Sequence, residues 1–514
     1  MSTLFSRRHF LGTALAAGAL SAKPAAASAA PDRPKRLVAT TRTLEVNGRA
    51  ARVFGLAGPD GRQGLTLDPG QHFHVDLADQ AGVRTLVHWH GQLPPWRQDG
   101  FPWPQTPPIA NGAVESYDFA PIAGTYWMHS HHELQEQKLM AAPLIVHDAA
   151  SRQEDRQEVV LMLHDFSFRS PDELLARLTG KSAARAQARA NEPTPAHDAG
   201  SPLRTMPGMT MPDGPIENAD ATKPMQAMTM SGGATAMNMS GGMPMDLNDV
   251  DYDAFLANDR TLADPDVVRL ERGGRVRLRI INGASASQFW IDLGVLTGHV
   301  VAVDGHPVHP VAGQSFPLAM AQRLDLLLDL PGEGTFPILA RLEGSLRRTG
   351  IVLTTANAPI ARLAEHGQAA PPVDHSLEAR LSAIAPLRPR SPDLVKTIAL
   401  AGAMRPYAWS MDGALWPHVP PLMLSRGQRV EIELVNQSMM AHPMHLHGHV
   451  FQVVALNGEP MQGAVRDTVL VPVMGCVRIA FDAINPGRWA FHCHNLYHMQ
   501  TGMMMEFRYH GIEV

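Results

Sequence analysis

The chain has 514 residues, of which 45% are hydrophobic and 18% charged, with a formal net charge of −5. These values predict a globular protein of about three domains with a sizeable buried core, and they exclude the basic excess of a nucleic-acid-binding protein. The composition also includes 25 histidines and 27 methionines beside only two cysteines. Imidazole and thioether groups favour soft or borderline metals, so the composition indicates copper.

The N-terminus has the order of an export signal. Arg7 and Arg8 precede an apolar run, and small residues of the A-x-A kind follow near Ala27–Ala30. The paired arginines resemble a twin-arginine signal. A membrane anchor is the alternative, but the apolar run is shorter than the ~20 residues that a membrane span needs. We therefore expect residues 1–30 to be a signal peptide, and the mature protein to be periplasmic with no membrane span.

Most of the remaining chain predicts short β-strands separated by turns, which the 43 glycines and 42 prolines supply. The stretches "LERGGRVRLRIIN" at 270–282 and "LSRGQRVEIELVN" at 424–436 match, each ending in a strand of alternating apolar and polar residues. A looser third copy is "LDPGQHFHVDLAD" at 67–79. Three such units at wide spacing predict three related β domains, built as sandwiches or barrels.

One segment, about residues 180–248, breaks this pattern and is rich in methionine, with Gly, Pro, Ala and Ser between the methionines. Its methionines are Met206, Met209, Met211, Met225, Met228, Met230, Met237, Met239, Met243 and Met245. A buried helix would show Leu, Ile and Phe at helical spacing, which this Met-rich segment lacks. A disordered linker is one interpretation, and a thioether loop that captures Cu(I) is another. The two are compatible.

Four histidine clusters carry the chemistry of this chain. They are "HWHG" with His88 and His90, "HSH" with His129 and His131, "HPMHLHG" with His442, His445 and His447, and "HCHNLYHMQTGM" with His492, Cys493, His494, His498 and Met503. Residues i and i+2 of a strand face the same side, so each His-x-His pair can present two imidazoles to one place. One such pair is common without a metal, but four pairs, two near each end of the chain, indicate a metal site.

The fourth cluster is the most specific. In an extended segment, Cys493 faces one side while His492 and His494 face the other. A thiolate, two histidines and a weak axial methionine form the ligand set of a blue-copper centre. Cys493, His498 and Met503 supply three of these four ligands.

The second histidine of this centre must come from elsewhere in the chain. His442 is the natural donor, because His445 and His447 have the opposite strand parity. Eight histidines then remain, and without carboxylates they suit a cluster of three copper ions. These eight are His88, His90, His129, His131, His445, His447, His492 and His494.

A Cys476–Cys493 disulfide is the alternative use of the two cysteines, since an oxidising compartment permits it. Such a bridge would leave His498 and Met503 without a role. We therefore expect Cys476 to be a lone thiol that is buried as a small apolar residue.

These four motifs resemble those of the multicopper oxidase family, which includes laccases, ascorbate oxidase, ceruloplasmin and bacterial copper-resistance oxidases. All four stand in order, and the resemblance extends to the supporting stretch "NPGRWAFHCH" and to the three-domain length. It implies an all-β protein with three cupredoxin-like domains, each a Greek-key β-sandwich or barrel. These would span residues 35–150, 155–358 and 375–514, with the Met-rich segment inserted in the second.

The resemblance also implies four copper ions and assigns their ligands. The type 1 copper would have His442, Cys493 and His498, with Met503 axial; the type 2 copper would have His88 and His445; and the type 3 pair would have His90, His129, His131, His447, His492 and His494. Electrons would pass from Cys493 to the neighbouring His492 and His494. Asp99 falls where the family often keeps a carboxylate that helps deliver protons, although an Asp in a turn before Gly100 is the alternative interpretation.

The implied activity is one-electron oxidation of a substrate, coupled to four-electron reduction of dioxygen to water. The Met-rich segment favours Cu(I) as the substrate and a role in copper tolerance, with phenols or aromatic amines as broader substrates. We expect the protein to be a monomer. Alternatives are copper sequestration by the Met-rich segment without turnover, a laccase that oxidises Mn(II) or phenols, and a scaffold without copper.

Two positions depart from the family pattern. Several relatives carry a carboxylate just after the histidine matched by His498, where this chain has Met499 and Gln500. A second proton relay is therefore either missing or supplied from another segment. Cuprous oxidases tend to have an acid and a methionine just before the ligand matched by His442; here Met440 is present, but Ser438 replaces the acid. Met440 and the ten methionines of the Met-rich segment are thus the candidate ligands for substrate copper.

Overall fold

The computed structural model describes residues 33–181, 247–355 and 358–513. The predicted signal peptide and the ten methionines of the Met-rich segment therefore lie outside the described residues. Within the described part of the chain, no helix is both long and apolar enough to cross a membrane.

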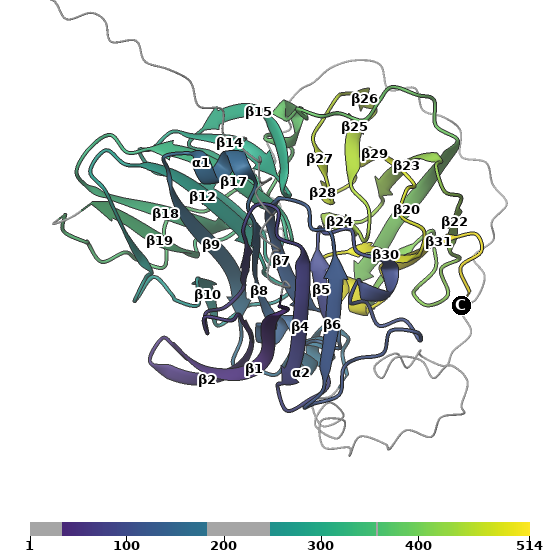
Figure 1. Ribbon diagram of the computed structural model, residues 1–514, viewed down its shortest axis with the longest axis horizontal. Helices are drawn as coiled ribbons and strands as arrows, with labels where there is room; N and C mark the ends of the chain where they lie inside the picture. The colour runs from purple at the N-terminus through teal and green to yellow at the C-terminus, as the bar shows by residue number, and fades with distance from the viewer. Residues whose placement is uncertain (1–32, 182–246, 356–357, 514) are drawn as a thin grey trace, which may run out of the picture. The chain divides into compact units, whose positions relative to one another are not determined.

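The first segment, residues 35–146, forms two sheets that are purple to blue in Figure 1. One sheet has the order β2 (Arg49–Ala57), β1 (Lys35–Val46), β4 (Phe73–Gln80) and β6 (Val114–Phe119). The other has the order β3 (Leu65–Leu67), β8 (Ala141–Val146), β7 (Gly124–Ser130) and β5 (Val87–His90). Their apolar faces enclose one core, to which Leu37, Leu77, Trp89 and Leu144 contribute fully buried side chains.

The middle segment, described over residues 157–181 and 247–355, forms two larger sheets. One has the order β10 (Ala254–Ala257), β9 (Gln157–Phe166), β12 (Arg275–Asn282), β17 (Arg323–Asp329), β14 (Gly298–Val303) and β15 (His306–Gly313). The other has the order β11 (Val267–Leu270), β19 (Arg348–Thr355), β18 (Thr335–Leu342), β13 (Phe289–Asp292) and β16 (Ser315–Leu318).

The third segment, residues 394–509, completes the set and is green to yellow in Figure 1. One sheet has the order β21 (Tyr407–Met411), β20 (Leu394–Met404), β23 (Arg429–Asn436), β29 (Cys476–Asp482), β25 (Phe451–Leu456) and β26 (Glu459–Pro460), with β27 (Val465–Arg466) also paired to β25. The other has the order β22 (Leu422–Leu424), β31 (Met504–Tyr509), β30 (Arg488–Cys493), β24 (His442–Leu446) and β28 (Thr468–Val471).

Helices are short among the described residues. They are α1 (Ala149–Gln153), α2 (Pro171–Leu178) and α4 (Leu496–Gln500), with the 3₁₀ turns η1 (Trp96–Gln98), η2 (Glu136–Lys138) and η3 (Glu378–Arg380). The sequence of α2 shows why it forms: the Ser170 hydroxyl accepts from the Glu173 amide as an N-cap, and Pro171 occupies the first turn.

The three sequence repeats occupy equivalent places in the three segments. In each, the second strand of the repeat (β4, β12 or β23) pairs in parallel with β1, β9 or β20 and antiparallel with β6, β17 or β29. The first strand of the repeat (β3, β11 or β22) pairs in parallel with β8, β19 or β31 of the other sheet. Each repeat therefore crosses from one sheet to the other, which confirms the prediction of three related β units.

The alternation predicted for residues 275–282 is present in the first half of the strand only, since Arg279, Ile281 and Asn282 are also buried. Val276, Leu278 and Ile280 are fully buried in β12, whereas Arg275 is exposed. Burying such side chains is the main stabilising term of the fold, at about 25 cal/mol per Å² of apolar surface. One hydrophobic cluster includes residues of both the middle and the third segments, from Val159 to Tyr509. The all-β class is confirmed, while the predicted limits of the three domains stay predictions.

Candidate metal centres

Four strands from the two ends of the chain bring the histidine motifs together. In the first segment, β5 pairs antiparallel with β7, so that His88 lies opposite His129. In the third segment, β24 pairs antiparallel with β30, so that His445 lies opposite His492. The close histidine groups take members from both pairs of strands. The site is thus an interface between segments that are far apart in the sequence.

Cys493 lies in a triad with two histidines. The Nδ1 atoms of His442 and His498 are 3.1 Å apart, and Cys493 Sγ lies 3.7 and 3.6 Å from them. All three side chains are fully buried. We call this group the Cys493 triad; it unites the cysteine and the two histidines that the sequence analysis expected at one site.

Local structure around Cys493 explains how His498 reaches it. Asn495 is the N-cap of α4, and its side chain accepts from the main-chain amides of Tyr497 and His498 at 3.1 and 3.3 Å. Met503 is fully buried, its amide donates to His498 O at 3.0 Å, and its carbonyl accepts from Cys493 N at 3.1 Å. The one-turn helix therefore returns the chain to Cys493.

The outward nitrogens of the Cys493 triad also have partners. His442 Nε2 lies 2.7 Å from Ser438 Oγ. His498 Nε2 lies 3.2 Å from Asp249 Oδ2, and both of these side chains are fully buried. Asp249 was not identified from the sequence, because it is about 250 residues from the triad and beside no histidine. Ser438, singled out as a departure from the family pattern, takes the place of an acid as the partner of His442.

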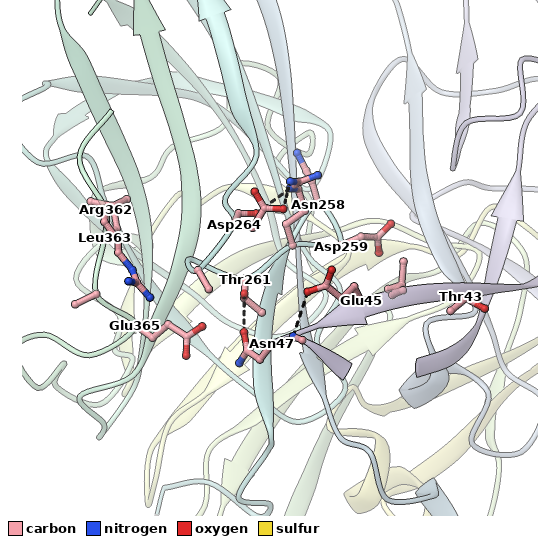
Figure 2. Close-up of a pocket in the computed structure, with 15 residues that line it drawn as sticks. Thr43, Glu45, Asn47, Asn258, Asp259, Thr261, Asp264, Arg362, Leu363 and Glu365 are labelled. Carbon is pink, nitrogen blue, oxygen red and sulfur yellow. Dashed lines mark hydrogen bonds and ion pairs between the residues drawn. The ribbon is translucent and has the colours of Figure 1, made fainter. Parts of the chain in front are cut away.

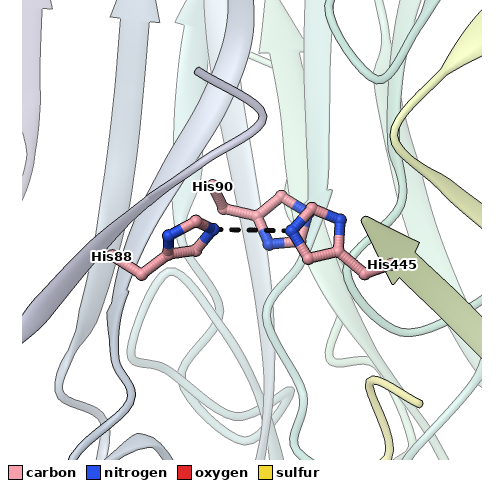
Figure 3. A group of neighbouring side chains, drawn as sticks. All are labelled: His88, His90 and His445. Atoms are coloured by element: carbon pink, nitrogen blue, oxygen red, sulfur yellow. Dashed lines mark hydrogen bonds between the residues drawn. The ribbon is translucent and has the colours of Figure 1, made fainter. Parts of the chain in front are cut away.

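The other eight histidines form a second group, the eight-histidine cluster. Close groupings within it are His88 with His90 and His445, His90 with His129 and His494, and His131 with His447 and His492. Figure 3 shows the first of these, with His88 and His445 facing each other at an Nε2–Nε2 distance of 3.4 Å and the rings of His90 and His445 overlapping. No member of the cluster is more than 3% exposed.

Most rings of this cluster have one nitrogen bonded outwards, which leaves the other turned towards the cluster. The outward contacts are His88 Nδ1 to Asp99 O at 2.8 Å, His90 Nε2 to Asp467 Oδ1 at 3.1 Å, His129 Nδ1 to Glu136 Oε2 at 2.7 Å, His445 Nδ1 to Asp467 O at 2.9 Å, His447 Nδ1 to Asp99 Oδ2 at 2.8 Å and His492 Nδ1 to Cys493 O at 2.9 Å. Outward bonds of this kind fix the tautomer and the orientation of ligand histidines.

Three buried carboxylates therefore surround the eight-histidine cluster: Asp99, Glu136 and Asp467. Asp99 was singled out from the sequence, and its contact with His447 means that it is not only a residue of the turn before Gly100. The turn is real as well, because Gly100 has φ +77° and a Cβ there would lie 1.8 Å from Val87 O. Glu136 and Asp467 were not predicted from the sequence. Glu136 follows the second histidine motif by a few residues, a spacing that could have drawn attention to it, whereas no neighbouring residue marks Asp467.

Burial keeps these imidazoles neutral. It lowers the pKa of His492 to about 3, and it lowers the pKa values of His129 and His131 well below the ordinary 6.5, with neighbouring histidines adding to the effect. Burial also raises the pKa of the Cys493 thiol and of the Glu136 carboxyl, the latter with a further contribution from Asp165. Neutral imidazole is the form that binds a metal.

The donor set fits copper. His131 Nε2 and His494 Nε2 are buried without a hydrogen-bond partner among the described residues, an arrangement that an ion would satisfy. Two nitrogens that bind one ion at about 2.0 Å lie roughly 3.3 Å apart, close to the observed 3.4 Å between the Nε2 atoms of His88 and His445. A trigonal set of one thiolate and two histidines is the geometry of a blue-copper site.

The positions at which the chain departs from the family pattern provide no acid to these centres. Met499 is mostly buried, and Gln500 donates to Glu133 O at 3.2 Å, so neither supplies an acid to the site. Met440 is only 7% exposed, whereas its neighbour Met439 is 63% exposed.

The two cysteines are both free, so the alternative of a disulfide is wrong. The expectation that Cys476 is buried is also wrong, since it is partly exposed. Cys476 is the first residue of β29, where that strand emerges from a turn, so packing covers only part of its side chain.

A polar cavity of about 1080 Å³ lies away from the histidines, between the turn that joins β1 to β2 and the loop between β10 and β11. Figure 2 shows Asn47 and Thr261 bonded across it, with Arg362 and Glu365 on the other side. Its lining contains no histidine, cysteine or methionine, so it does not belong to the metal centres.

Comparisons with known proteins agree with this geometry. Family models described as multicopper oxidase match residues 40–151, 213–363 and 389–511. The chain is 30% identical to multicopper oxidase MmcO of Mycobacterium tuberculosis, over 98% of this chain and 97% of that protein. It is 27% identical to a copper resistance protein A homolog of Pseudomonas syringae pv. tomato, over 99% of this chain and 100% of that protein.

Solved structures are similar in fold. Fet3p, described as a multicopper oxidase that functions in iron import, gives a TM-score of 0.70 at 18% identity, over 92% of this chain and 90% of that one. A multi-copper oxidase from Pseudomonas thermotolerans gives 0.64 at 22% identity, over 93% of this chain and 99% of that one. These likenesses confirm the predicted class of cupredoxin-like β domains.

Proposed function

Because this chain belongs to the multicopper oxidase family, whose members are copper-dependent oxidoreductases that use dioxygen, we propose that it oxidises Cu(I) and reduces dioxygen to water. The observation that carries the proposal is the tripeptide His492–Cys493–His494. Its thiol belongs to the Cys493 triad, and its two imidazoles belong to two different groups of the eight-histidine cluster. One short peptide therefore joins an electron-entry site to an oxygen site.

The proposed cofactor is four copper ions. The Cys493 triad with Met503 would hold the type 1 copper, and His88 with His445 the type 2 copper. The two type 3 coppers would take one group each, His90 with His129 and His494, and His131 with His447 and His492. When bound, copper accepts single electrons and delivers four of them to dioxygen. The arrangement of the groups supports this division, since the histidines and Cys493 of each proposed set lie close together.

The residues of the chain contribute orientation, burial and proton placement. Covalent bonds and the backbone alone separate the Cys493 thiol from the adjacent imidazoles, which gives a short path for electrons. Burial of all eight histidines excludes bulk water from the oxygen site. Asp99 Oδ2 accepts a hydrogen bond from His447 Nδ1 at 2.8 Å. Asp99 is therefore the residue that we propose holds a proton beside the cluster.

Two observations support Cu(I) over a phenol as the substrate. Both imidazoles of the Cys493 triad are fully buried, with Ser438 Oγ 2.7 Å from His442 Nε2 and Asp249 Oδ2 3.2 Å from His498 Nε2, so neither ring is open to contact with an aromatic substrate. Asp249 also follows Met245, the last methionine of the Met-rich segment, by four residues. The Met-rich segment, whose thioethers favour Cu(I), therefore ends in the sequence close to a residue that contacts the proposed electron-entry site. The exposed Met439, three residues before His442, adds another thioether.

A substrate comparison tests this proposal. Deleting residues 200–245 should lower the rate of Cu(I) oxidation more than the rate of phenol oxidation, because only the first uses thioethers. A control chain in which the ten methionines become leucines keeps the length and apolar character and should show the same selective loss. Equal losses for both substrates would contradict Cu(I) as the substrate and leave a laccase that oxidises phenols.

Copper resistance protein A relatives support a place for the activity in copper tolerance. Together with the twin-arginine-type signal, this leads us to propose a periplasmic monomer that lowers the concentration of Cu(I) by oxidising it. Copper sequestration alone is the competing function. It predicts that cells carrying a Cys493→Ser protein keep full copper tolerance, whereas an oxidase predicts that they lose it.

A further inference from the structure

One buried ion pair connects the middle segment to the eight-histidine cluster. Arg323, the first residue of β17, donates from Nη1 and Nη2 to the two carboxylate oxygens of Asp467, at 2.7 and 2.5 Å. Both side chains are fully buried. Burying two charges is costly, so such a pair persists only with good geometry and with further bonds to its remaining atoms.

Asp467 uses this fixed position to bond His90. Its Oδ1 accepts from His90 Nε2 at 3.1 Å and from Thr468 Oγ1 at 2.8 Å. A carboxylate is an acceptor only, so Nε2 must carry the ring proton and Nδ1 keeps its lone pair. That Nδ1 lies 3.4 Å from His129 Nε2, in the group that also contains His494.

His90 is therefore turned the other way from its neighbours. His88, His445, His447 and His492 each bond outwards through Nδ1, and His129 Nδ1 lies 2.7 Å from Glu136 Oε2. A ring that presents Nδ1 to the cluster needs an acceptor at its Nε2, and Asp467 supplies it. His445 differs, because its Nδ1 donates to the main-chain carbonyl of Asp467 at 2.9 Å, which any side chain at position 467 leaves in place; the Asp467 carboxylate lies farther from this nitrogen, at 3.5 Å.

Arg323 also joins the three segments. Its Nε donates to Thr125 O of the first segment at 3.2 Å, and its main-chain amide donates to Asp304 Oδ1 of the middle segment at 2.8 Å. Burial alone would raise the pKa of Asp467, but the Arg323 guanidinium outweighs it and holds that pKa well below the usual range. The described part of the middle segment contributes no histidine to the cluster, yet it holds the acceptor of His90.

We propose that Arg323 and Asp467 are positioning residues, through which the middle segment fixes the His90 tautomer that presents Nδ1 to the copper shared with His129 and His494. The inference rests on the proposed function and deepens it. It gives the middle segment a part in building the oxygen site.

The test compares two double variants. Arg323→Met with Asp467→Leu removes both charges together, which avoids leaving one charge buried alone. The control, Arg279→Met with Asp325→Leu, removes another buried pair, at 2.7 Å, which also bonds Thr125 of the first segment but contacts none of the eight histidines. Copper per chain is measured by metal analysis after dialysis against a chelator, together with the visible absorption of the copper–thiolate bond.

The Arg323/Asp467 variant should keep the thiolate absorption and lose about one copper per chain, with retention of that copper weakened about 10- to 100-fold. The control should keep the copper content of the unchanged protein. Asp467→Asn alone should show the same loss, because an amide that offers its oxygen to Arg323 turns its NH₂ group towards His90 Nε2.

Full copper content in both Asp467 variants would overturn the inference, as would an equal copper loss in the control or a simultaneous loss of the thiolate absorption. These results differ from a failure of the proposed function itself. That failure would show in the unchanged protein, as absence of the thiolate absorption and of oxygen uptake after copper loading.

Discussion

The Cys493 triad and the eight-histidine cluster both use buried imidazoles, but the chain builds them differently. The triad comes from β24, β30 and α4 of the third segment alone. The cluster takes four histidines from the first segment and four from the third, with two carboxylates from the first segment and one from the third. The triad therefore takes its donors from one segment, whereas the cluster exists only where two segments meet. In the proposed function, electron entry uses donors of one segment and the oxygen site depends on the interface.

The surroundings differ as well. In the triad, one hydroxyl and one carboxylate, Ser438 and Asp249, occupy the outward nitrogens. The cluster has three buried carboxylates within reach of its rings. A site that transfers only electrons needs its donors held still, whereas a site that forms water must also hold protons. The distribution of carboxylates matches that division.

Replacing the thiol should separate the two regions most strongly. In Cys493→Ser, the thiolate absorption should vanish and oxygen uptake should fall by more than about 100-fold, the upper range for loss of a residue that only supports a ligand. Copper bound by the eight-histidine cluster should remain, as metal analysis would show. Loss of all copper in this variant would mean that the cluster depends on the triad for assembly, against the comparison drawn above.

Asp99→Asn should act on the cluster alone. Oxygen uptake should fall about 10- to 100-fold, because the amide cannot take up a proton beside His447, while the thiolate absorption stays unchanged. Steady-state oxygen consumption and the visible spectrum measure the two effects. Asp118→Asn, at an exposed carboxylate that also contacts a histidine, His72, is the control and should leave both unchanged. A change in the thiolate absorption of Asp99→Asn would count against separate regions.

Acid should destabilise the copper-free protein. Burial lowers the pKa of His492 to about 3 and that of His449 to about 4, against 6.5 for an exposed histidine. Between these values the unfolded chain binds more protons, so stability is complete above about pH 6.5 and is lost as the pH falls towards 4 and 3. Each such histidine contributes about 1.4 kcal/mol per pH unit in this window.

Denaturant unfolding of the copper-free protein between pH 7.5 and 5 measures this loss. In the copper-loaded protein, bound metal should hold His492 neutral, so the slope should be smaller. Identical slopes with and without copper would show that His492 is not a ligand.

Asp249→Asn should give the smallest effect, confined to the triad. A carboxylate on Nε2 makes His498 a stronger donor and favours the oxidised metal, so the amide should raise the reduction potential. A tenfold change in relative affinity for the two oxidation states corresponds to about 59 mV. Redox titration of the thiolate absorption measures this shift, with Ser438→Ala as the comparison at the other imidazole. A fall in potential would contradict the assigned role.

The sequence by itself determined which side chains are the proposed donors. Strand parity in "HCHNLYHM" separated Cys493 from His492 and His494, because alternation is a local property of an extended backbone. The same reasoning placed His442 apart from His445 and His447, and the repeats that end in β4, β12 and β23 predicted the three β units. These inferences depend on covalent spacing, which the linear sequence contains.

Only the tertiary structure decided which carboxylates serve the donors. Asp249 and Asp467 reach His498 and His90 through the docking of segments, and their sequence neighbours give no sign of it, whereas Glu136 lies only a few residues after the histidine motif that it contacts. Local spacing cannot predict a contact that forms between residues hundreds of positions apart, since it depends on how whole sheets pack. Local sequence spacing therefore specifies the proposed metal donors, because the side to which a side chain points depends on its own strand. The carboxylates that orient those donors reach them only once the segments have packed together.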